Sequence, residues 1–276
     1  MLKGFIKIIR PINCLITLAA IIIGGLICSY DNKISVLLIL AALVGFLTTA
    51  AGNTINDIFD IDIDRINRPE RPLPSFMITL KQAWSFYILL VITSLGLSLF
   101  FNQFAFLIVL LSSLLLMLYS LSVKRVPVFG NVVISFLTAY AFVFAGMVVG
   151  NVRGALIPAG FAFLINMIRE VIKDIEDIEG DKLAGVRTLP ISYGIKVSKH
   201  FVLAVSSVLF LFTFMPFLFH IYTIEFFLIV MIVVNPILFY AVKLLYEDAS
   251  KKNLGKISSL LKLTMVIGLL AIYLGK

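Results

Sequence analysis

The sequence predicts an all-α integral membrane protein, a bundle of nine transmembrane helices. Of its 276 residues, 61% are hydrophobic and only 14% are charged, and the mean hydropathy is +1.09. An ordinary soluble domain has about a quarter of its residues charged. The apolar residues also come in runs of about 17–25, which is the length that crosses a bilayer as a helix. No polar stretch is long enough to fold alone, so we expect a single transmembrane domain over residues 1–276.

Apolar runs of membrane-spanning length occur nine times along the chain. The expected spans are 12–29, 34–58, 83–101, 104–122, 131–149, 154–175, 197–220, 222–242 and 257–275. The charged N-terminus followed by an apolar run imitates a signal peptide, but the run is too long and no small-residue cleavage site ends it. We therefore keep it as the first membrane helix.

The net charge of +8 follows the expected topology. With the N-terminus in the cytoplasm, 20 of the 23 Lys and Arg residues fall in cytoplasmic segments, and the outer side keeps Lys33, Arg153 and Lys276. Membrane proteins concentrate Lys and Arg in their cytoplasmic segments. We therefore expect a multi-pass protein of the cell membrane with a cytoplasmic N-terminus. The cations gather at helix ends and form no extended basic face, so nucleic acid is not an expected partner.

Two acidic segments each close a long apolar run. Residues 51–75 contain five acidic residues and residues 169–185 contain six, which together make eleven of the 15 in the chain. At about 100° per helical residue, each segment gathers polar side chains on one face. In the first segment this face holds Asn53, Asn56, Asp57, Asp60 and Asp64, and Asp62 points away. In the second, if the helix continues to Gly180, it holds Asn166, Glu170, Lys173, Asp174, Asp177 and Asp181, with Glu176 and Glu179 off it.

Carboxylates crowded on one helical face repel one another, so a cationic partner is expected. Oxygen ligands with no Cys or His nearby suit Mg²⁺, which is usually held by one or two carboxylates plus substrate phosphates. The two segments end the second and the sixth predicted helices, which both run from the outer to the cytoplasmic side. The sequence therefore predicts a cytoplasm-facing active site in which the two segments face one another across Mg²⁺ and a diphosphate.

The two segments carry motifs that resemble a known family. Asn56-Asp57-x-x-Asp60-x-x-x-Asp64 with its Arg-Pro tail, and Lys173-Asp174-x-x-Asp177-x-x-Gly180-Asp181, resemble the paired aspartate motifs of the UbiA superfamily of intramembrane prenyltransferases. Motif order, motif spacing and the apolar helices agree over nearly the whole chain. The resemblance implies a Mg²⁺-dependent prenyltransferase that releases diphosphate. The implied metal ligands are Asp57, Asp60, Asp64, Asp174, Asp177 and Asp181, joined as catalytic residues by Asn53 and Asn56.

The likeness is greatest to the archaeal ether-lipid branch of this superfamily. It rests on the Arg10-Pro-x-Asn13 opening, the loop at 67–74 and the run from Lys173 to Asp181. It implies that a geranylgeranyl group passes from geranylgeranyl diphosphate to the free glycerol hydroxyl of geranylgeranylglyceryl phosphate, which forms the second ether bond of archaeal membrane phospholipids. The candidate substrate-binding residues are Arg10, Asn13, Arg68, Arg71, Tyr119, Lys124, Arg125 and Lys173.

Other interpretations of the sequence stay open. The acceptor could instead be aromatic, such as a quinone or haem precursor. A transporter or channel is an alternative of another class, because nine helices with intramembrane acids also suit an ion pathway. The Pro-rich loop at 68–75 and the segment 188–190 are both expected to close the site from the aqueous side. The sequence defines neither the oligomeric state nor which cations hold the diphosphate and which the acceptor phosphate.

Overall fold

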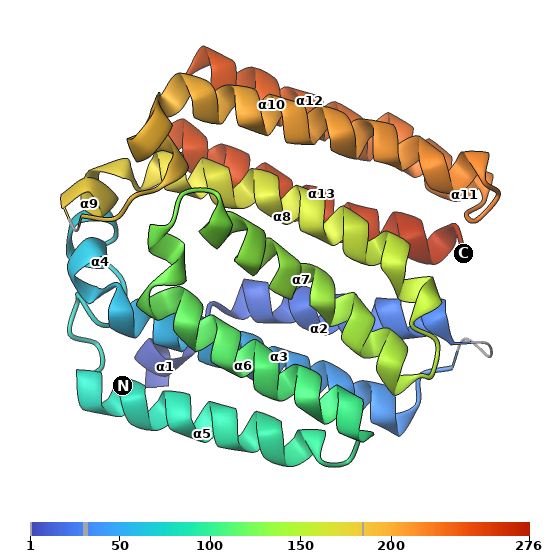
Figure 1. The fold of residues 1–276 in the computed structure, drawn as a ribbon, viewed down its shortest axis with the longest axis horizontal. Helices are drawn as coiled ribbons and strands as arrows, with labels where there is room; N and C mark the ends of the chain where they lie inside the picture. Colours follow the sequence, from blue (N-terminus) through green and yellow to red (C-terminus); the bar gives the residue numbers. More distant parts are fainter. Residues whose placement is uncertain (1, 30–32, 184) are drawn as a thin grey trace.

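The structure is a computed structural model that describes residues 2–29, 33–183 and 185–276. Within these ranges, nine helical segments are long and apolar enough to cross a membrane, which confirms the predicted fold class. Figure 1 shows the long helices running side by side as one bundle. The helices are α1 (Leu2–Ile8), α2 (Pro11–Cys28), α3 (Val36–Phe59), α4 (Ile61–Asn67), α5 (Leu80–Ser98), α6 (Gln103–Leu121), α7 (Phe129–Val148), α8 (Leu156–Glu176), α9 (Ile178–Leu183), α10 (Leu189–Leu218), α11 (Ile224–Ile229), α12 (Asn235–Glu247) and α13 (Lys251–Leu274).

Several helices extend beyond the predicted spans. Helix α10 begins at Leu189, so the segment 188–190 is the N-cap and first turn of a helix and not a loop. Pro190 fits there because the first turn of a helix needs no proline N–H. Gly194 (φ 87°, ψ 158°) interrupts α10, and the long stretch that follows this kink begins close to the predicted start at 197. Helix α13 begins at Lys251 instead of 257, behind the N-cap Ser250. The hydropathy pattern misses the first turns of α13 because they are polar and precede the apolar run.

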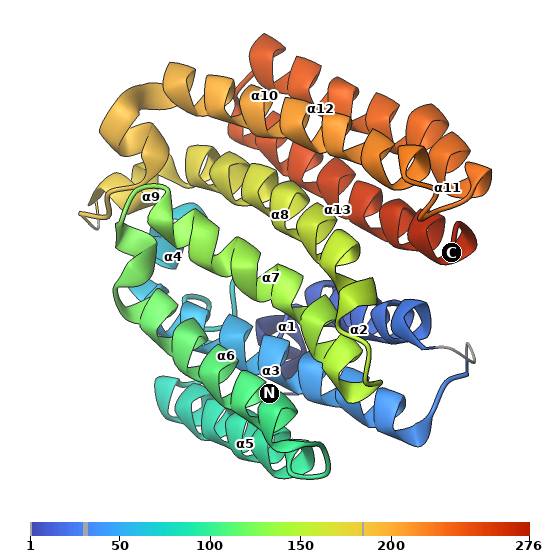
Figure 2. The ribbon, with the colours of Figure 1, turned by 45° about the vertical axis from the view of Figure 1, so that its right-hand side comes forward.

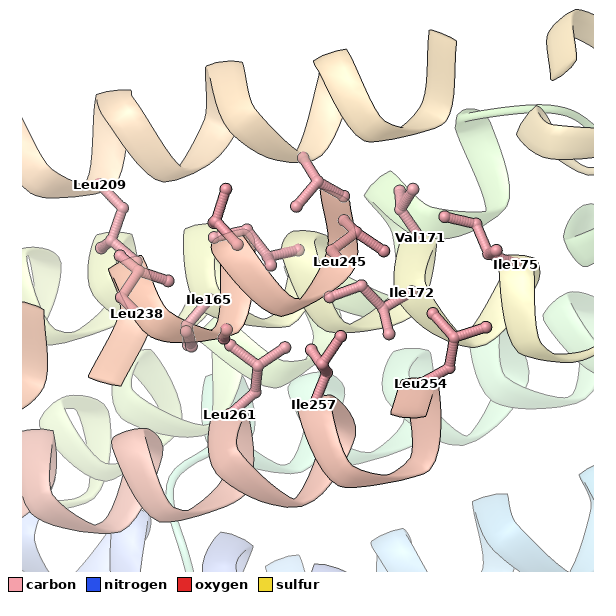
Figure 3. Close-up of a cluster of buried hydrophobic side chains, with 14 of the residues drawn as sticks. Ile165, Val171, Ile172, Ile175, Leu209, Leu238, Leu245, Leu254, Ile257 and Leu261 are labelled. Atoms are coloured by element: carbon pink, nitrogen blue, oxygen red, sulfur yellow. The ribbon is translucent and has the colours of Figure 1, made fainter. Parts of the chain in front are cut away.

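Helix α8 is the centre of the bundle. It packs against α7 on one side and against α10 and α13 on the other. Figure 3 shows the apolar contact between α8, α10, α12 and α13. The residues labelled there are Ile165, Val171, Ile172, Ile175, Leu209, Leu238, Leu245, Leu254, Ile257 and Leu261. This packing fixes the position of α8, which carries the second acidic motif at its end.

Both acidic motifs lie at the same end of the bundle. Figures 1 and 2 place the short helices α4 and α9 beside one another there, and the two helices are in contact. Each motif contains a helix break that the sequence analysis did not foresee. Helix α3 ends before Asp60 (φ −98°, ψ 9°) and helix α8 before Asp177 (φ −98°, ψ 7°), and a new short helix begins directly after each residue. The assignment of one helical face was therefore wrong beyond Asp60 in the first motif, and the condition set for the second motif, a helix that continues to Gly180, is not met.

Candidate active site

The two helix breaks turn the ends of both motifs across the end of the bundle. Because the chain changes direction at Asp60, Asp64 lies on α4 and not on the long helix that carries Asp57. The break at Asp177 likewise moves Asp181 from α8 to α9. The structure still brings five of the six aspartates to one polar cavity of about 80 Å³. They are Asp60, Asp64, Asp174, Asp177 and Asp181.

Every aspartate of the first motif pairs with a cation. Asp57 is only 2% exposed and forms ion pairs with Arg10 and with Arg71, the latter at 3.3 Å. Asp64 accepts two hydrogen bonds from Nη1 of Arg71, at 2.7 and 2.5 Å. Asp60 pairs with Lys124, which follows α6, and also accepts a hydrogen bond of 2.7 Å from the Asn56 side-chain amide. The negative charges of three carboxylates are therefore balanced by the positive charges of three cations.

Arg10 reaches Asp57 from a strained backbone position. It is the N-cap of α2 and adopts the left-handed conformation (φ 51°, ψ 72°), which is unfavourable for a residue with a side chain. Such positions cost on the order of 1–3 kcal/mol and cluster at functional sites. The ion pair with Asp57 and the Pro11 that opens α2 hold this conformation.

The second motif has fewer cationic partners. Asp177 accepts a hydrogen bond of 2.9 Å from Arg68, and Glu176, expected off the polar face, lies 3.3 Å from the same guanidinium. Asp174 accepts a hydrogen bond of 2.8 Å from the amide of Asn131 on α7, which is a neutral donor. Asp181 forms no ion pair with any residue that the structure describes. The second motif therefore keeps an excess of negative charge.

Asn67 joins the two motifs. Its side-chain amide donates a hydrogen bond of 3.0 Å to the backbone carbonyl of Asp177 and accepts one of 3.1 Å from the backbone N–H of Gly180. Lys251, at the start of α13, donates to the backbone carbonyl of Asn67 over 2.8 Å. These contacts hold α4 against α9 and α13, so the loop after α4 places Arg68 and Arg71 over the polar cavity.

Burial alters the acidity of two groups at this end of the bundle. It lowers the pKa of Lys124 to about 8, with the like charge of Arg125 adding to the effect. It raises the pKa of Asp181 to about 7, and the nearby Asp177 carboxylate contributes. Both shifts have the same main cause, because burial disfavours the charged form of a group of either sign. A ligand that brings compensating charge would therefore be stabilised here.

A larger cavity inside the bundle adjoins the polar one and shares part of its lining. This second cavity has a volume of about 310 Å³ and is lined mainly by apolar side chains from α2, α3, α6, α7, α8 and α13. Five residues line both cavities, and they mark the junction between them: Arg10, Asn56, Tyr119, Glu170 and Lys173. The site therefore consists of a charged chamber joined to an apolar one.

The donor set fits Mg²⁺ by its chemistry. The polar cavity offers carboxylate oxygens, and neither Cys nor His lines it. In the part of the chain that the structure describes, no three acidic side chains converge closely enough to hold a metal ion by themselves. This arrangement agrees with the usual mode of Mg²⁺, which takes one or two carboxylates and completes its octahedron with water and substrate phosphates.

Four predicted site residues do not line the polar cavity. Asn53 and Asn13 line only the apolar cavity, and the Asn53 amide donates to the backbone carbonyl of Ile9 over 2.8 Å. Arg125 is exposed and lines neither cavity. Asp57 also does not line the polar cavity, because its two arginines enclose it. Asp62 points outward and pairs with Arg65, as expected.

Sequence reasoning missed three residues of the site and included a fourth, Thr188, only as part of the segment 188–190 expected to close it. Asn67 and Asn131 position the aspartates, and no local pattern distinguishes them from ordinary loop and helix polar residues. Thr188 is 5% exposed, lines the polar cavity and has a hydroxyl with no partner among the described residues. Lys262 was assigned to the cytoplasmic cations but lies inside α13 and lines the apolar cavity. Its signal was a lone charge within an apolar run, and such charges are often functional.

The fold and the site define a class of protein: an integral membrane protein that can hold a charged head group at one end of its bundle and an apolar chain inside it. The family follows from comparison with known sequences. The chain belongs to the UbiA prenyltransferase family, whose model matches residues 17–265.

Relatives with assigned names match over nearly their full length. The chain is 39% identical to the digeranylgeranylglyceryl phosphate synthase of Methanococcus aeolicus over 275 residues, covering 99% of this chain and 98% of that protein. It is 34% identical to the enzyme of the same name from Methanosphaera stadtmanae, covering 99% of both.

Solved structures share the fold. A structure of digeranylgeranylglyceryl phosphate synthase matches with a TM-score of 0.76 and 39% identity, covering 99% of this chain and 98% of that one. A UbiA homologue from Archaeoglobus fulgidus, solved with DMAPP and Mg²⁺ bound, matches with a TM-score of 0.64 and 20% identity, covering 98% and 99%. At 20% identity the likeness concerns the fold alone.

Proposed function

We propose that this protein is a Mg²⁺-dependent prenyltransferase that transfers a geranylgeranyl group from geranylgeranyl diphosphate to the free glycerol hydroxyl of geranylgeranylglyceryl phosphate. The product carries the second ether bond of an archaeal membrane phospholipid. The name of the full-length relatives supports this substrate pair, because that name describes the product. Family membership supports the reaction type.

One observation carries the proposal: the junction between the charged and the apolar cavity. A prenyl diphosphate has a highly charged head and a purely apolar chain, and the two cavities offer one chamber for each. With the diphosphate in the polar cavity and the chain in the apolar one, the C–O bond that breaks lies near the residues that line both. Tyr119 and Asn56 are the uncharged members of that group.

The cations of the site stabilise the leaving group. Arg68, Arg71 and Lys124 line the polar cavity and are already held in place by the aspartates. Preorganised positive charge of this kind lowers the barrier to forming a charged leaving group. The diphosphate departs with the electron pair of the C–O bond. The acceptor hydroxyl oxygen then bonds to the allylic carbon and gives its proton to the departed diphosphate. The apolar cavity walls exclude water, which would otherwise capture the allylic cation.

The residues that would hold Mg²⁺ are the aspartates of the polar cavity: Asp60, Asp64, Asp174, Asp177 and Asp181, with Asp57 behind them. When bound, Mg²⁺ neutralises the diphosphate and makes it a better leaving group. Asp174 and Asp181 would bind Mg²⁺ without breaking an ion pair, because neither is paired with a cation among the residues that the structure describes.

The proposed setting is the cell membrane, with one domain over residues 1–276 and the active site and N-terminus on the cytoplasmic side. The distribution of Lys and Arg supports this orientation, because Lys33, Arg153 and Lys276 lie at the end of the bundle opposite the motifs. A cytoplasmic site also lets the charged head groups of both substrates reach it without crossing the bilayer.

The test is diphosphate release by the purified protein with geranylgeranyl diphosphate and Mg²⁺. Geranylgeranylglyceryl phosphate or an aromatic acid serves as the acceptor, and EDTA serves as the control. We expect release with the glycerol lipid only, and none in EDTA. Release with only the aromatic acid would overturn the proposed acceptor while keeping the prenyltransferase. No diphosphate release with any acceptor, together with ion flux across liposomes that contain the protein, would favour a transporter.

A further inference from the structure

A second group of charged side chains lies deeper in the bundle than the aspartates. Arg169, Glu170 and Lys173 on α8 and Lys262 on α13 all line the apolar cavity. Lys262 follows Lys251, the first residue of α13, by 11 positions, about 16 Å along the helix axis. Arg169 precedes the end of α8 by seven positions, about 10 Å. These charges therefore lie well inside the membrane-spanning part of the helices.

This group has too few carboxylates for its cations. Glu170 accepts hydrogen bonds from Arg169 at 3.0 Å and from Lys173 at 2.9 Å, so one acid serves two cations. Lys262 forms no ion pair with the described residues and experiences the like charges of Arg169 and Lys173. Arg169 is 9% exposed, and its Nε has no hydrogen-bond partner in the described chain. Three cations and one carboxylate leave an excess of two positive charges.

An uncompensated charge inside a membrane protein is expensive, and it is usually retained for a function. The excess here matches one phosphate monoester, which carries about −1.5 to −2 charges at pH 7. Arginine and lysine are also the side chains that bind phosphate best, arginine through two parallel N–H donors. The free Nε of Arg169 provides one such donor at the cavity wall.

The cations in this group differ from those around the aspartates. Arg68, Arg71 and Lys124 line the polar cavity and not the apolar one, whereas Arg169 and Lys262 line the apolar cavity and not the polar one. The first set is already paired with aspartates. The two sets therefore offer separate places for two phosphate-bearing groups. Lys173 and Glu170 line both cavities and lie between the sets.

We infer that Arg169, Lys173 and Lys262 form the subsite for the phosphate of the lipid acceptor. This inference rests on the proposed function, because it takes the acceptor to be a glycerol lipid with a phosphate head group. Glu170 holds Arg169 and Lys173 in position. The subsite lies next to the junction of the cavities, so a phosphate bound there presents the neighbouring glycerol hydroxyl to the prenyl donor. An acceptor without a phosphate leaves the subsite empty.

The test compares Lys262→Met with Lys256→Met, a matched change at an exposed position of the same helix that lines neither cavity. For each protein we would measure kcat/KM with geranylgeranylglyceryl phosphate and with geranylgeranylglycerol, and the KM for geranylgeranyl diphosphate. Lys262→Met should lower kcat/KM for the phosphorylated acceptor about ten-fold or more, as expected for loss of a hydrogen bond between charged groups. It should leave the KM of the donor and the activity on geranylgeranylglycerol within two-fold.

Lys262→Arg, which keeps the charge, should retain most of the kcat/KM for the phosphorylated acceptor. Arg169→Lys, which keeps the charge but removes Nε, should lower that kcat/KM about three-fold, a smaller loss than in Lys262→Met. The inference is overturned if Lys262→Met matches Lys256→Met, lowers activity on both acceptors equally, or raises the KM of the donor. The proposed function is tested separately by the unmodified protein, and it is wrong if that protein prenylates neither geranylgeranylglyceryl phosphate nor geranylgeranylglycerol.

Discussion

The two acidic motifs occupy equivalent positions but differ in charge balance. Both have a helix break with nearly identical backbone angles, and both present their carboxylates at the same end of the bundle. In the first motif, Arg10, Arg71 and Lys124 match three aspartates. In the second, Arg68 is the one cation paired with the acids at 174–181 in the described chain, and it serves both Glu176 and Asp177.

This difference indicates a division of roles. The first motif is a preassembled set of ion pairs that positions cations for the diphosphate, so its aspartates are structural as well as potential ligands. The second motif keeps unbalanced negative charge, which favours the arrival of a divalent cation. Removing a carboxylate should therefore have opposite effects on stability in the two motifs, even if both changes reduce activity.

The largest expected effect on stability is that of Asp57→Asn. The change leaves Arg10 without its carboxylate and weakens the hold on Arg71, and removing one partner of a buried ion pair typically costs 3–5 kcal/mol. We expect the free energy of unfolding to fall by about 3 kcal/mol, the low end of this range, because the Arg10 side chain is 23% exposed and its charge is partly solvated. The unfolding free energy in detergent, measured by denaturant titration in EDTA, checks this value. An unchanged midpoint would show that Arg10 finds another partner and that the first motif is not structural.

The next effect concerns catalysis and not stability. Asp181→Asn should lower kcat by about 100-fold, the typical loss when one electrostatic contact to the reacting groups is removed. Its unfolding midpoint in EDTA should equal or exceed that of the unmodified protein, because burial raises the pKa of Asp181 and its charge has no cationic partner in the described chain. The matched control is Asp62→Asn, which removes an exposed carboxylate and should change kcat less than two-fold. A destabilised Asp181→Asn would contradict the comparison.

Most of the fold could be predicted from the sequence, because nine apolar runs dominate it and each needs a bilayer. The helix breaks at Asp60 and Asp177 could not, since the 100° rule assigns faces on an ideal helix but does not say where a helix ends. The aspartates were found because they are rare acids in an apolar chain. Asn67 and Asn131 act through contacts 110 and 43 residues away, which a local pattern does not reveal.

The smallest of these effects should come from the link between the two motifs. A Cβ atom at Gly180 would lie 2.4 Å from the Asn67 side-chain nitrogen, so Gly180→Ala must displace the amide that joins α4 to α9. Two hydrogen bonds would be lost, each worth about 1 kcal/mol. We expect kcat to fall about ten-fold, because Arg68 and Arg71 follow Asn67 on the same segment and would lose their fixed positions over the polar cavity.

The control for this change is Gly96→Ala, which also adds a methyl group to a helix but has no atom within 4 Å of the new Cβ. It should leave kcat unchanged and raise the unfolding midpoint slightly, since alanine favours a helix more than glycine does. If Gly180→Ala behaves like Gly96→Ala, the two motifs do not depend on Asn67 for their alignment. A ten-fold loss of kcat in Gly180→Ala alone would instead show that the contact between the two motifs fixes the positions of Arg68 and Arg71.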